Sequence, residues 1–307
     1  MELKNLLEAQ QLTPDILFTL FKKADEIRKN PKSFLDALRG KIIATLFYEP
    51  STRTRLSFES AMMRLGGEVI STENAKEFSS AVKGESMEDT ARIVAAYCDC
   101  IVMRHYEEGS AKKASDVVKI PIINAGDGKG QHPTQALLDL YTIYREFGHL
   151  DNLKIAMVGD LLSGRTVRSL CYLLGKFPAT EVVFVSPEHL KIREDIKEYL
   201  TKHKVKFSDS DNLNKVLKEV NVIYMTRIQK ERMSLEDYEK AKGKFVINEE
   251  NFNLIKKDSI IMHPLPHVEE IDLPISIEKE DKRVAYFRQA ENGLYIRMAL
   301  LLMLLKD

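Results

Sequence analysis

The segment KIIATLFYEPSTRTRLSFESAMMRLGGEVIST, residues 41–72, contains one complete strand–helix–strand unit. Its apolar run at residues 41–49 predicts a buried strand. The apolar pattern of the next residues predicts a helix that ends at Gly66 and Gly67, after which EVIST predicts a second strand. Continuous apolar strands separated by helices are typical of parallel sheets that are covered on both faces.

The same alternation continues along the chain. Further strands are predicted at residues 98–105, 120–127, 154–160, 181–187, 204–209, 221–226 and 259–266. Further helices are predicted at residues 13–30, with Thr13 as N-cap, and at 87–97, 132–148, 165–176, 189–202 and 292–306. The pattern favours an α/β fold with two doubly wound parallel-sheet domains and an active site in the cleft between them. We expect one domain at residues 1–133 plus 288–307, a second at 150–287, and a linking helix at 134–149.

Composition excludes several classes of protein. The 307 residues include 46 basic and 46 acidic side chains, and this balance argues against a nucleic-acid-binding protein. The three cysteines have neither metal-site spacing nor the number that a disulfide framework needs. No signal peptide is visible, and the longest apolar run is too short for a bilayer. We expect a cytoplasmic protein with no cofactor, no metal, no nucleic-acid partner and no membrane partner.

Basic residues and histidines follow most of the predicted strands. Ligands of open parallel sheets bind outside the carboxyl ends of the strands, so these residues are candidates for a binding site. The set as a whole predicts a pocket with fixed cations for a substrate that carries several negative charges. It comprises residues 51–55, Arg104, His105, residues 126–132, residues 159–165, Arg227 and residues 263–267.

The first turn of the helix after residue 50 is the strongest single candidate. With Ser51 as N-cap, the amides of Arg53 and Thr54 point toward any anion at the helix start, where the helix dipole is positive. Residues two positions apart cannot face one ligand, so we assign Arg53 to the ligand and Arg55 to a structural ion pair with Glu59. The alternative is an ordinary capped, solvated helix start.

Seven motifs, in chain order, carry a resemblance to a known family. They are PSTRTRLSFE (50–59), VMRH (102–105), INAGDG (123–128), HPTQALLDLYT (132–142), GRTVRSL (164–170), TRIQKER (226–232) and MHPLP (262–266). Together they span nearly the whole chain, which resembles the aspartate and ornithine carbamoyltransferase family. The likeness is closest to the aspartate-specific catalytic chains, because Leu265 stands where ornithine enzymes typically have cysteine and because TRIQKER is present.

The resemblance implies transfer of the carbamoyl group of carbamoyl phosphate to the α-amine of L-aspartate, an early step of pyrimidine synthesis. It assigns carbamoyl phosphate to the domain at 1–133 plus 288–307, and aspartate to the domain at 150–287. The implied carbamoyl-phosphate ligands are Ser51, Thr52, Arg53, Thr54, Arg104, His132, Gln135, Leu265 and Pro266. The implied aspartate ligands are Lys83, Arg165, Arg227 and Gln229. The implied catalytic residues are Arg53, Thr54, Lys83, Arg104 and His132.

Ser79 and Lys83 match a loop that, in the resembling family, reaches the active site of the neighbouring subunit. The resemblance therefore implies a homotrimer with shared active sites. From the residues alone, a lysine beside glycine in a polar loop is more typical of solvated surface. The partner class stays open between a regulatory chain and another enzyme of the pyrimidine pathway.

Structural roles compete with the functional ones at three positions. His132 precedes Pro133 and can simply cap a helix, whereas an arginine at a helix start, such as Arg165, opposes the dipole and so favours function. His263 is interpreted as a packed core histidine.

His267 is a departure from the resembling family, which usually has arginine there. It replaces a fixed charge with one that titrates near neutrality.

Two other protein classes compete with a carbamoyltransferase. The turn after residues 154–160 is similar to a dinucleotide site, but it lacks the G-x-G-x-x-G pattern, and no acidic residue ends the next strand. A non-catalytic anion-binding paralogue is the second alternative. The presence of every core position except the arginine replaced by His267 favours an enzyme.

Overall fold

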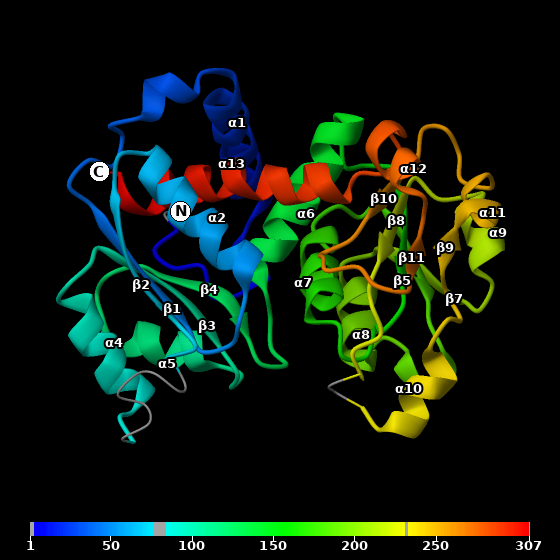
Figure 1. Ribbon diagram of the computed structural model, residues 1–307, viewed down its shortest axis with the longest axis horizontal. Coiled ribbons are helices and arrows are strands. Elements are labelled where there is room, and N and C mark those ends of the chain that lie inside the picture. Colours follow the sequence, from blue (N-terminus) through cyan, green and yellow to red (C-terminus); the bar gives the residue numbers. More distant parts are fainter. Residues whose placement is uncertain (1–2, 76–83, 231–232, 307) are drawn as a thin grey trace. The chain divides into compact units, whose positions relative to one another are not determined.

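The computed structural model describes residues 3–75, 84–230 and 233–306, and it divides into two compact units (Figure 1). Unit 1 comprises residues 1–141 and 291–307, and unit 2 comprises residues 142–290. The chain passes between them within α6 (Pro133–Phe147) and within α13 (Tyr286–Leu305). Each unit contains a parallel sheet with helices, which confirms the α/β class and the two parallel-sheet domains.

The sheet of unit 1 has the strand order β2-β1-β3-β4, and all its strands pair in parallel. The chain adds β2 on one side of β1 and then returns to add β3 and β4 on the other side. The order therefore reverses between β1 and β3, and such a switch point is where open parallel sheets bind ligands. The strands are β1 (Ile42–Phe47), β2 (Glu68–Glu73), β3 (Cys100–His105) and β4 (Ile122–Asp127).

Alternate residues of these strands face different helices, as the two-residue period of a strand requires. Ala44 and Leu46 of β1 join one core cluster with residues of α4 (Met87–Ala95) and α5 (Ser110–Val117), which Figure 1 shows on one side of the sheet. Thr45, between them, donates a hydrogen bond of 2.9 Å to Glu59 of α2 (Thr52–Arg64) on the other side.

Helix α2 is anchored from its outer side by a buried arginine of α13. Arg297 donates a hydrogen bond to Ser57, and its guanidinium lies 5.0 Å from the ring centre of Phe58. Burial lowers the pKa of Arg297 to about 10, an effect that the charge of Asp139 opposes. Helix α1 (Pro14–Lys29) begins as expected, with the Thr13 hydroxyl accepting from the amide of Ile16.

Unit 2 contains a five-stranded parallel sheet in the order β10-β8-β5-β6-β7 and a two-stranded sheet of β9 and β11. Its order reverses between β5 and β8. The strands are β5 (Lys154–Val158), β6 (Glu181–Val185), β7 (Lys206–Ser210), β8 (Val222–Met225), β9 (Ile247–Asn248), β10 (Ile260–Met262) and β11 (Ile271–Asp272). The helices are α7 (Arg165–Leu174), α8 (Glu194–Lys202), α9 (Leu213–Leu217), α10 (Leu235–Ala241), α11 (Glu249–Phe252) and α12 (Ile275–Glu280).

Two helix boundaries differ from those that the sequence predicts. The last helix begins at Tyr286 rather than Asn292, because its first turns mix apolar and charged residues: Phe287 is exposed and Arg288 forms an ion pair of 3.0 Å with Glu146. The charged helix expected from residue 189 begins at Glu194, after a short 3₁₀ turn. Within the described ranges, no helix combines the length and the apolar character that crossing a membrane requires.

Candidate functional site

The carboxyl ends of β1 and β3 lie side by side at the switch point of unit 1. Phe47 is in register with Arg104, and the amide of Tyr48 donates to the Arg104 carbonyl at 2.8 Å. Helix α2 begins a few residues after β1, so its first turn and Arg104 lie at the same edge of the sheet. The structure thereby brings together two segments that are about 50 residues apart in the chain, as strand pairing allows.

The start of α2 has polar side chains, at residues 51–54, that form no side-chain hydrogen bond with a described residue. Ser51 is the N-cap but makes no capping hydrogen bond, whereas Thr13 and Ser86 cap α1 and α4. Among the described residues, neither the Ser51 side chain nor those of residues 52–54 form a hydrogen bond. Because the first N–H groups of a helix also lack intrahelical acceptors, this turn can bind an anion through amides, hydroxyls and a guanidinium.

The two arginines of this turn have different surroundings. Arg55 is 3.1 Å from Glu59 and 2.8 Å from Glu73, which confirms the expected pair with Glu59 and adds a second carboxylate from β2. Arg53 forms no ion pair with a described residue, and partial burial lowers its pKa. Thus Arg55 stabilises the helix start, while the Arg53 guanidinium remains available to an anion.

Arg104 already has a carboxylate partner. Its Nη2 lies 3.3 Å from Glu49, and its Nη1 donates to the Ala125 carbonyl at 3.3 Å. The sequence analysis did not single out Glu49, although an acidic residue directly after β1 was a visible signal. An anion at this edge would therefore either share Arg104 with Glu49 or displace Glu49 from Arg104.

The neighbouring His105 has a structural role. It is 4% exposed, and its Nδ1 accepts from the Glu107 amide at 3.0 Å and contacts the Ser110 hydroxyl at 2.8 Å. Burial lowers the pKa of His105, although the carboxylates of Glu107 and Glu49 oppose this shift. A neutral imidazole is the result, so His105 adds no fixed charge to the site.

The loop after β4 is rigid and places His132. Gly128 has φ +48°, and a Cβ there would lie 2.4 Å from the Tyr106 carbonyl oxygen. The Asp127 carboxylate accepts from the amides of Gly109 and Gln131 at 2.8 and 2.9 Å. These contacts fix the path of the chain into α6.

His132 and Gln135 lie buried in the first turn of α6. The Nδ1 of His132 is 3.3 Å from the Thr134 hydroxyl, and a hydroxyl that donates to Nδ1 leaves the proton on Nε2. Gln135 donates from its amide nitrogen to Asp139 at 2.8 Å, so its amide oxygen is directed to other donors. Both side chains carry polar atoms of the kinds that bind a polar group of a ligand.

The second set of expected residues follows β5 and β8, at the switch point of unit 2. The Thr226 amide donates to the Val158 carbonyl at 2.8 Å, which joins the two strand ends. Arg165 is the first residue of α7 and is 7% exposed, and Arg227 and Gln229 are half-buried directly after β8. Two arginines at one sheet edge suit a ligand with two carboxylates.

Leu265 and Pro266 follow β10 in an unusual backbone conformation. Leu265 has φ +54°, a region that residues other than glycine rarely adopt, and the bond to Pro266 is cis. Neither carbonyl accepts a hydrogen bond from a described residue. The next residue, His267, is 3.2 Å from Glu278 and packs against the ring of Tyr286 at 5.2 Å.

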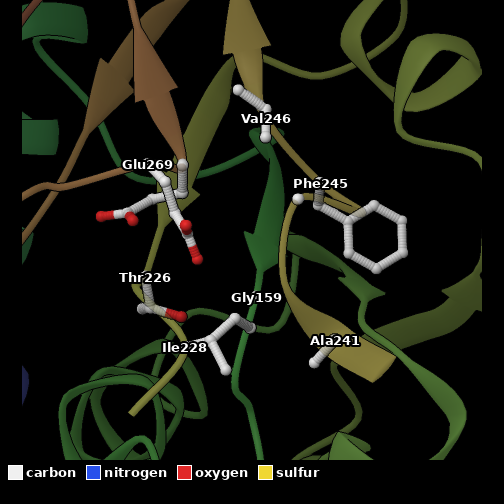
Figure 2. A pocket seen from close by; sticks show the side chains of 9 residues that line it. Gly159, Thr226, Ile228, Ala241, Phe245, Val246 and Glu269 are labelled. Atoms are coloured by element: carbon white, nitrogen blue, oxygen red, sulfur yellow. The ribbon is translucent and has the colours of Figure 1, made fainter. Parts of the chain in front are cut away.

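A small hollow in unit 2 is a different feature (Figure 2). The side chains of Thr226 and Glu269 point into it, and Glu270 also lines it. Its other lining residues are Gly159, Ile228, Ala241, Gly243, Phe245 and Val246. Two carboxylates without an arginine among the lining residues would repel a dianion, so this hollow is not where the expected aspartate would bind.

Two predicted residues, Ser79 and Lys83, lie outside the described residues. Within the part of the chain that is described, no cluster of histidine, cysteine, aspartate or glutamate could hold a metal ion. The residues at the two sheet edges can bind anions, donate hydrogen bonds and orient reactants.

Two family models match the chain, one for each half. "Aspartate/ornithine carbamoyltransferase, carbamoyl-P binding domain" matches residues 4–145, and "Aspartate/ornithine carbamoyltransferase, Asp/Orn binding domain" matches residues 151–304. Among curated relatives, aspartate carbamoyltransferase 2, chloroplastic, of Pisum sativum is 55% identical over 99% of this chain and 79% of its own length. The aspartate carbamoyltransferase catalytic subunit of Methanocaldococcus jannaschii is 48% identical over 99% of both chains.

Solved structures give the same result. The catalytic subunit of M. jannaschii aspartate transcarbamoylase has a TM-score of 0.90 at 48% identity and 99% coverage of both chains. Aspartate transcarbamoylase from Trypanosoma cruzi, in complex with N-(phosphonacetyl)-L-aspartic acid, has a TM-score of 0.92 at 38% identity and covers 99% of this chain and 96% of its own. The chain belongs to the aspartate/ornithine carbamoyltransferase family.

Proposed function

We propose that this chain is an aspartate carbamoyltransferase, which transfers the carbamoyl group of carbamoyl phosphate to the α-amine of L-aspartate. The products are N-carbamoyl-L-aspartate and phosphate, in de novo pyrimidine synthesis. The observation that carries the proposal is the match of both halves to the family, together with relatives at 55% and 48% identity that are named for aspartate. The complex of the T. cruzi relative with a phosphonate-aspartate conjugate supports the same pair of substrates.

The phosphate group is assigned to the edge of β1 and β3. The side chains of residues 51–54 form no hydrogen bonds among the described residues, and the helix start and Arg53 supply positive potential. Arg104 supplies a second guanidinium once an anion competes with Glu49. Residues 1–133 plus 288–307 are the proposed carbamoyl-phosphate domain, joined by the helix at 134–149 to the aspartate domain.

The carbamoyl group is assigned to His132, Gln135 and the carbonyls of Leu265 and Pro266. A proton on Nε2 of His132 would donate to the carbamoyl oxygen, while the acceptors would take the carbamoyl N–H groups. When the amine attacks, a C–N bond forms and the carbonyl oxygen becomes an oxyanion, which His132, Arg104 and Thr54 stabilise. Comparable oxyanion donors contribute roughly 3–4 kcal/mol each.

The intermediate then releases phosphate as the bond between carbon and the bridging oxygen breaks. The departing phosphate takes the proton of the amine, so the reaction needs no covalent intermediate and no cofactor. Orientation of two charged reactants can contribute about 7–11 kcal/mol of the barrier reduction. The two carboxylates of aspartate are assigned to Arg165, Arg227 and Gln229, whose residue types at the edge of β5 and β8 suit a dianion.

We propose further that the working protein is a cytoplasmic homotrimer in which Ser79 and Lys83 of one subunit complete the site of its neighbour. The family match supports this assembly, and Lys83 would add a cation for aspartate. A regulatory chain and another enzyme of the pyrimidine pathway are both compatible as further partners.

The test is carbamoyl transfer by the purified chain with carbamoyl phosphate and either L-aspartate or L-ornithine, measured across pH. Turnover with aspartate alone is the expected result. Turnover with ornithine would contradict the roles of Arg165 and Arg227. If neither amino acid reacts while phosphate alone raises the melting temperature, the chain is an anion-binding relative. A rise with NAD instead would favour the dinucleotide-binding alternative.

A further inference from the structure

A buried contact between a histidine and a carboxylate lies next to the segment proposed to bind the carbamoyl group. His263 follows β10, and its Nε2 is 2.8 Å from Oε1 of Glu270; their side chains are 1% and 5% exposed. Gln289 of α13 accepts from the His263 amide at 2.8 Å and fixes the backbone there. The proposed chemistry uses neither member of the pair.

Each member also holds a backbone amide of the intervening segment. The Leu265 amide donates to Nδ1 of His263 at 2.8 Å, and the Val268 amide donates to Oε1 of Glu270 at 3.1 Å. Because Nδ1 accepts, the imidazole proton resides on Nε2, the atom that lies 2.8 Å from the carboxylate. The two side chains together thus hold both ends of the loop at residues 264–269.

The electrostatics of the pair favour a charged carboxylate. Burial alone raises the pKa of Glu270, but the contact with His263 and the Val268 amide outweigh it and hold that pKa below its usual value. An anionic Glu270 is the stronger acceptor for the Val268 amide.

The braced segment contains the strained residue of the site. A non-glycine residue at φ +54° persists only where its surroundings hold it, and the amide of Leu265 is held by His263. The carbonyls of Leu265 and Pro266 accept from no described residue, and the contacts of His263 and Glu270 hold the backbone on either side of them.

We propose that His263 and Glu270 are positioning residues that fix the carbonyls of Leu265 and Pro266 for the N–H groups of the carbamoyl substrate. This inference rests on the proposed function. It gives His263 a role beyond the core packing that the sequence indicated. The pair acts on the carbamoyl half of the substrate and leaves the phosphate half, which is assigned to unit 1, untouched.

Two substitutions separate the two contacts of His263. His263→Asn places an acceptor near the position of Nδ1 and so keeps the contact with the Leu265 amide. His263→Gln reaches toward Glu270 instead and loses the contact with the Leu265 amide. Affinities for carbamoyl phosphate and for inorganic phosphate would be measured by calorimetry for each variant. Val216→Ala, a buried truncation in α9, is the control for a general loss of stability.

The expected result is a carbamoyl-phosphate affinity about tenfold weaker in His263→Gln, with phosphate affinity unchanged and with His263→Asn closer to the parent. Glu270→Gln keeps the size of the side chain, and we expect it to weaken the binding of carbamoyl phosphate by an intermediate factor. This variant replaces His263→Gln in the test if His263→Gln does not fold. The inference would be overturned if His263→Gln weakened the binding of carbamoyl phosphate and of phosphate equally. It would also be overturned if Val216→Ala weakened the binding of carbamoyl phosphate by the same factor. A parent chain without transfer to aspartate would contradict the proposed function instead, because the binding comparison does not depend on turnover.

Discussion

Two arginines in one helical turn have different environments, and only part of this could be predicted. The pair between Arg55 and Glu59 follows from helix geometry alone, because residues four positions apart share a face. The second partner, Glu73, comes from β2 and reaches Arg55 only because β1 and β2 pair in parallel. Local contacts were therefore predictable, whereas those that depend on strand pairing were not.

The availability of Arg53 leads to a prediction about activity. Arg53→Ala removes the guanidinium that has no ion pair among the described residues, so we expect kcat/KM for carbamoyl phosphate to fall on the order of 100-fold. The melting temperature should stay within about 1 °C of the parent, because no structural contact is lost. Steady-state kinetics and thermal unfolding measure the two effects.

Arg55→Ala, the matched control, breaks two ion pairs and should cost about 1 kcal/mol of stability with a much smaller loss of activity. Equal losses of activity in the two variants would show that the two arginines do not have separate roles.

Sequence reasoning missed two carboxylates, one in each unit. Glu49 contacts Arg104, and Glu270 contacts His263, and each contact joins segments that only the fold brings together. The cations were recognised from their motifs and from their places after strands. A carboxylate that neutralises them has no motif of its own, because its position relative to the cation depends on strand order and loop path.

At the scale of elements, the kinds of structure were predictable and their order in space was not. Strands and helices follow from apolar periods, and the Thr13 cap of α1 is confirmed. The orders β2-β1-β3-β4 and β10-β8-β5-β6-β7 contain the two switch points, and no local pattern encodes them. Short elements such as β9 and α12 were also not predicted, because a few residues are too short a stretch to show a periodic apolar pattern.

The close approach of β5 and β8 depends on one glycine. Gly159 has φ +115°, and a Cβ there would lie 2.1 Å from the carbonyl oxygen of Thr226, the residue before Arg227. Gly159→Ala therefore combines an unfavourable φ with a backbone clash, and we expect it to cost about 3 kcal/mol or more. Thermal unfolding should show a drop of roughly 6 °C or more.

Gly243→Ala separates the two causes. Gly243 also has a positive φ, of +68°, but no atom lies within 4 Å of the added Cβ, so only the conformational cost of about 1 kcal/mol remains. If both variants lost the same stability, the clash with Thr226 would be excluded as a cause.

At the scale of the molecule, composition said little about the site. A formal net charge of zero is compatible with local clusters of arginine, because surface acidic residues balance them elsewhere. The arginines gather because each sheet reverses its order once and because strand ends meet at that point. Fold class was thus readable from repeated patterns, while the concentration of charge depends on topology.

The proposed trimer makes a prediction that needs no knowledge of how its subunits dock. If Lys83 of one subunit completes the site that contains Arg53 of its neighbour, Arg53→Ala and Lys83→Ala chains should each be nearly inactive alone. After the two are mixed in equal amounts, dissociated and reassembled, about a quarter of the sites should contain both intact residues, given random assembly around a closed ring. Activity should return to about a quarter of the parent value, whereas a site built within one subunit would never regain both residues. Parent chains taken through the same treatment are the control for losses in reassembly, and their recovery with a silent mixture would show that Lys83 acts within its own subunit.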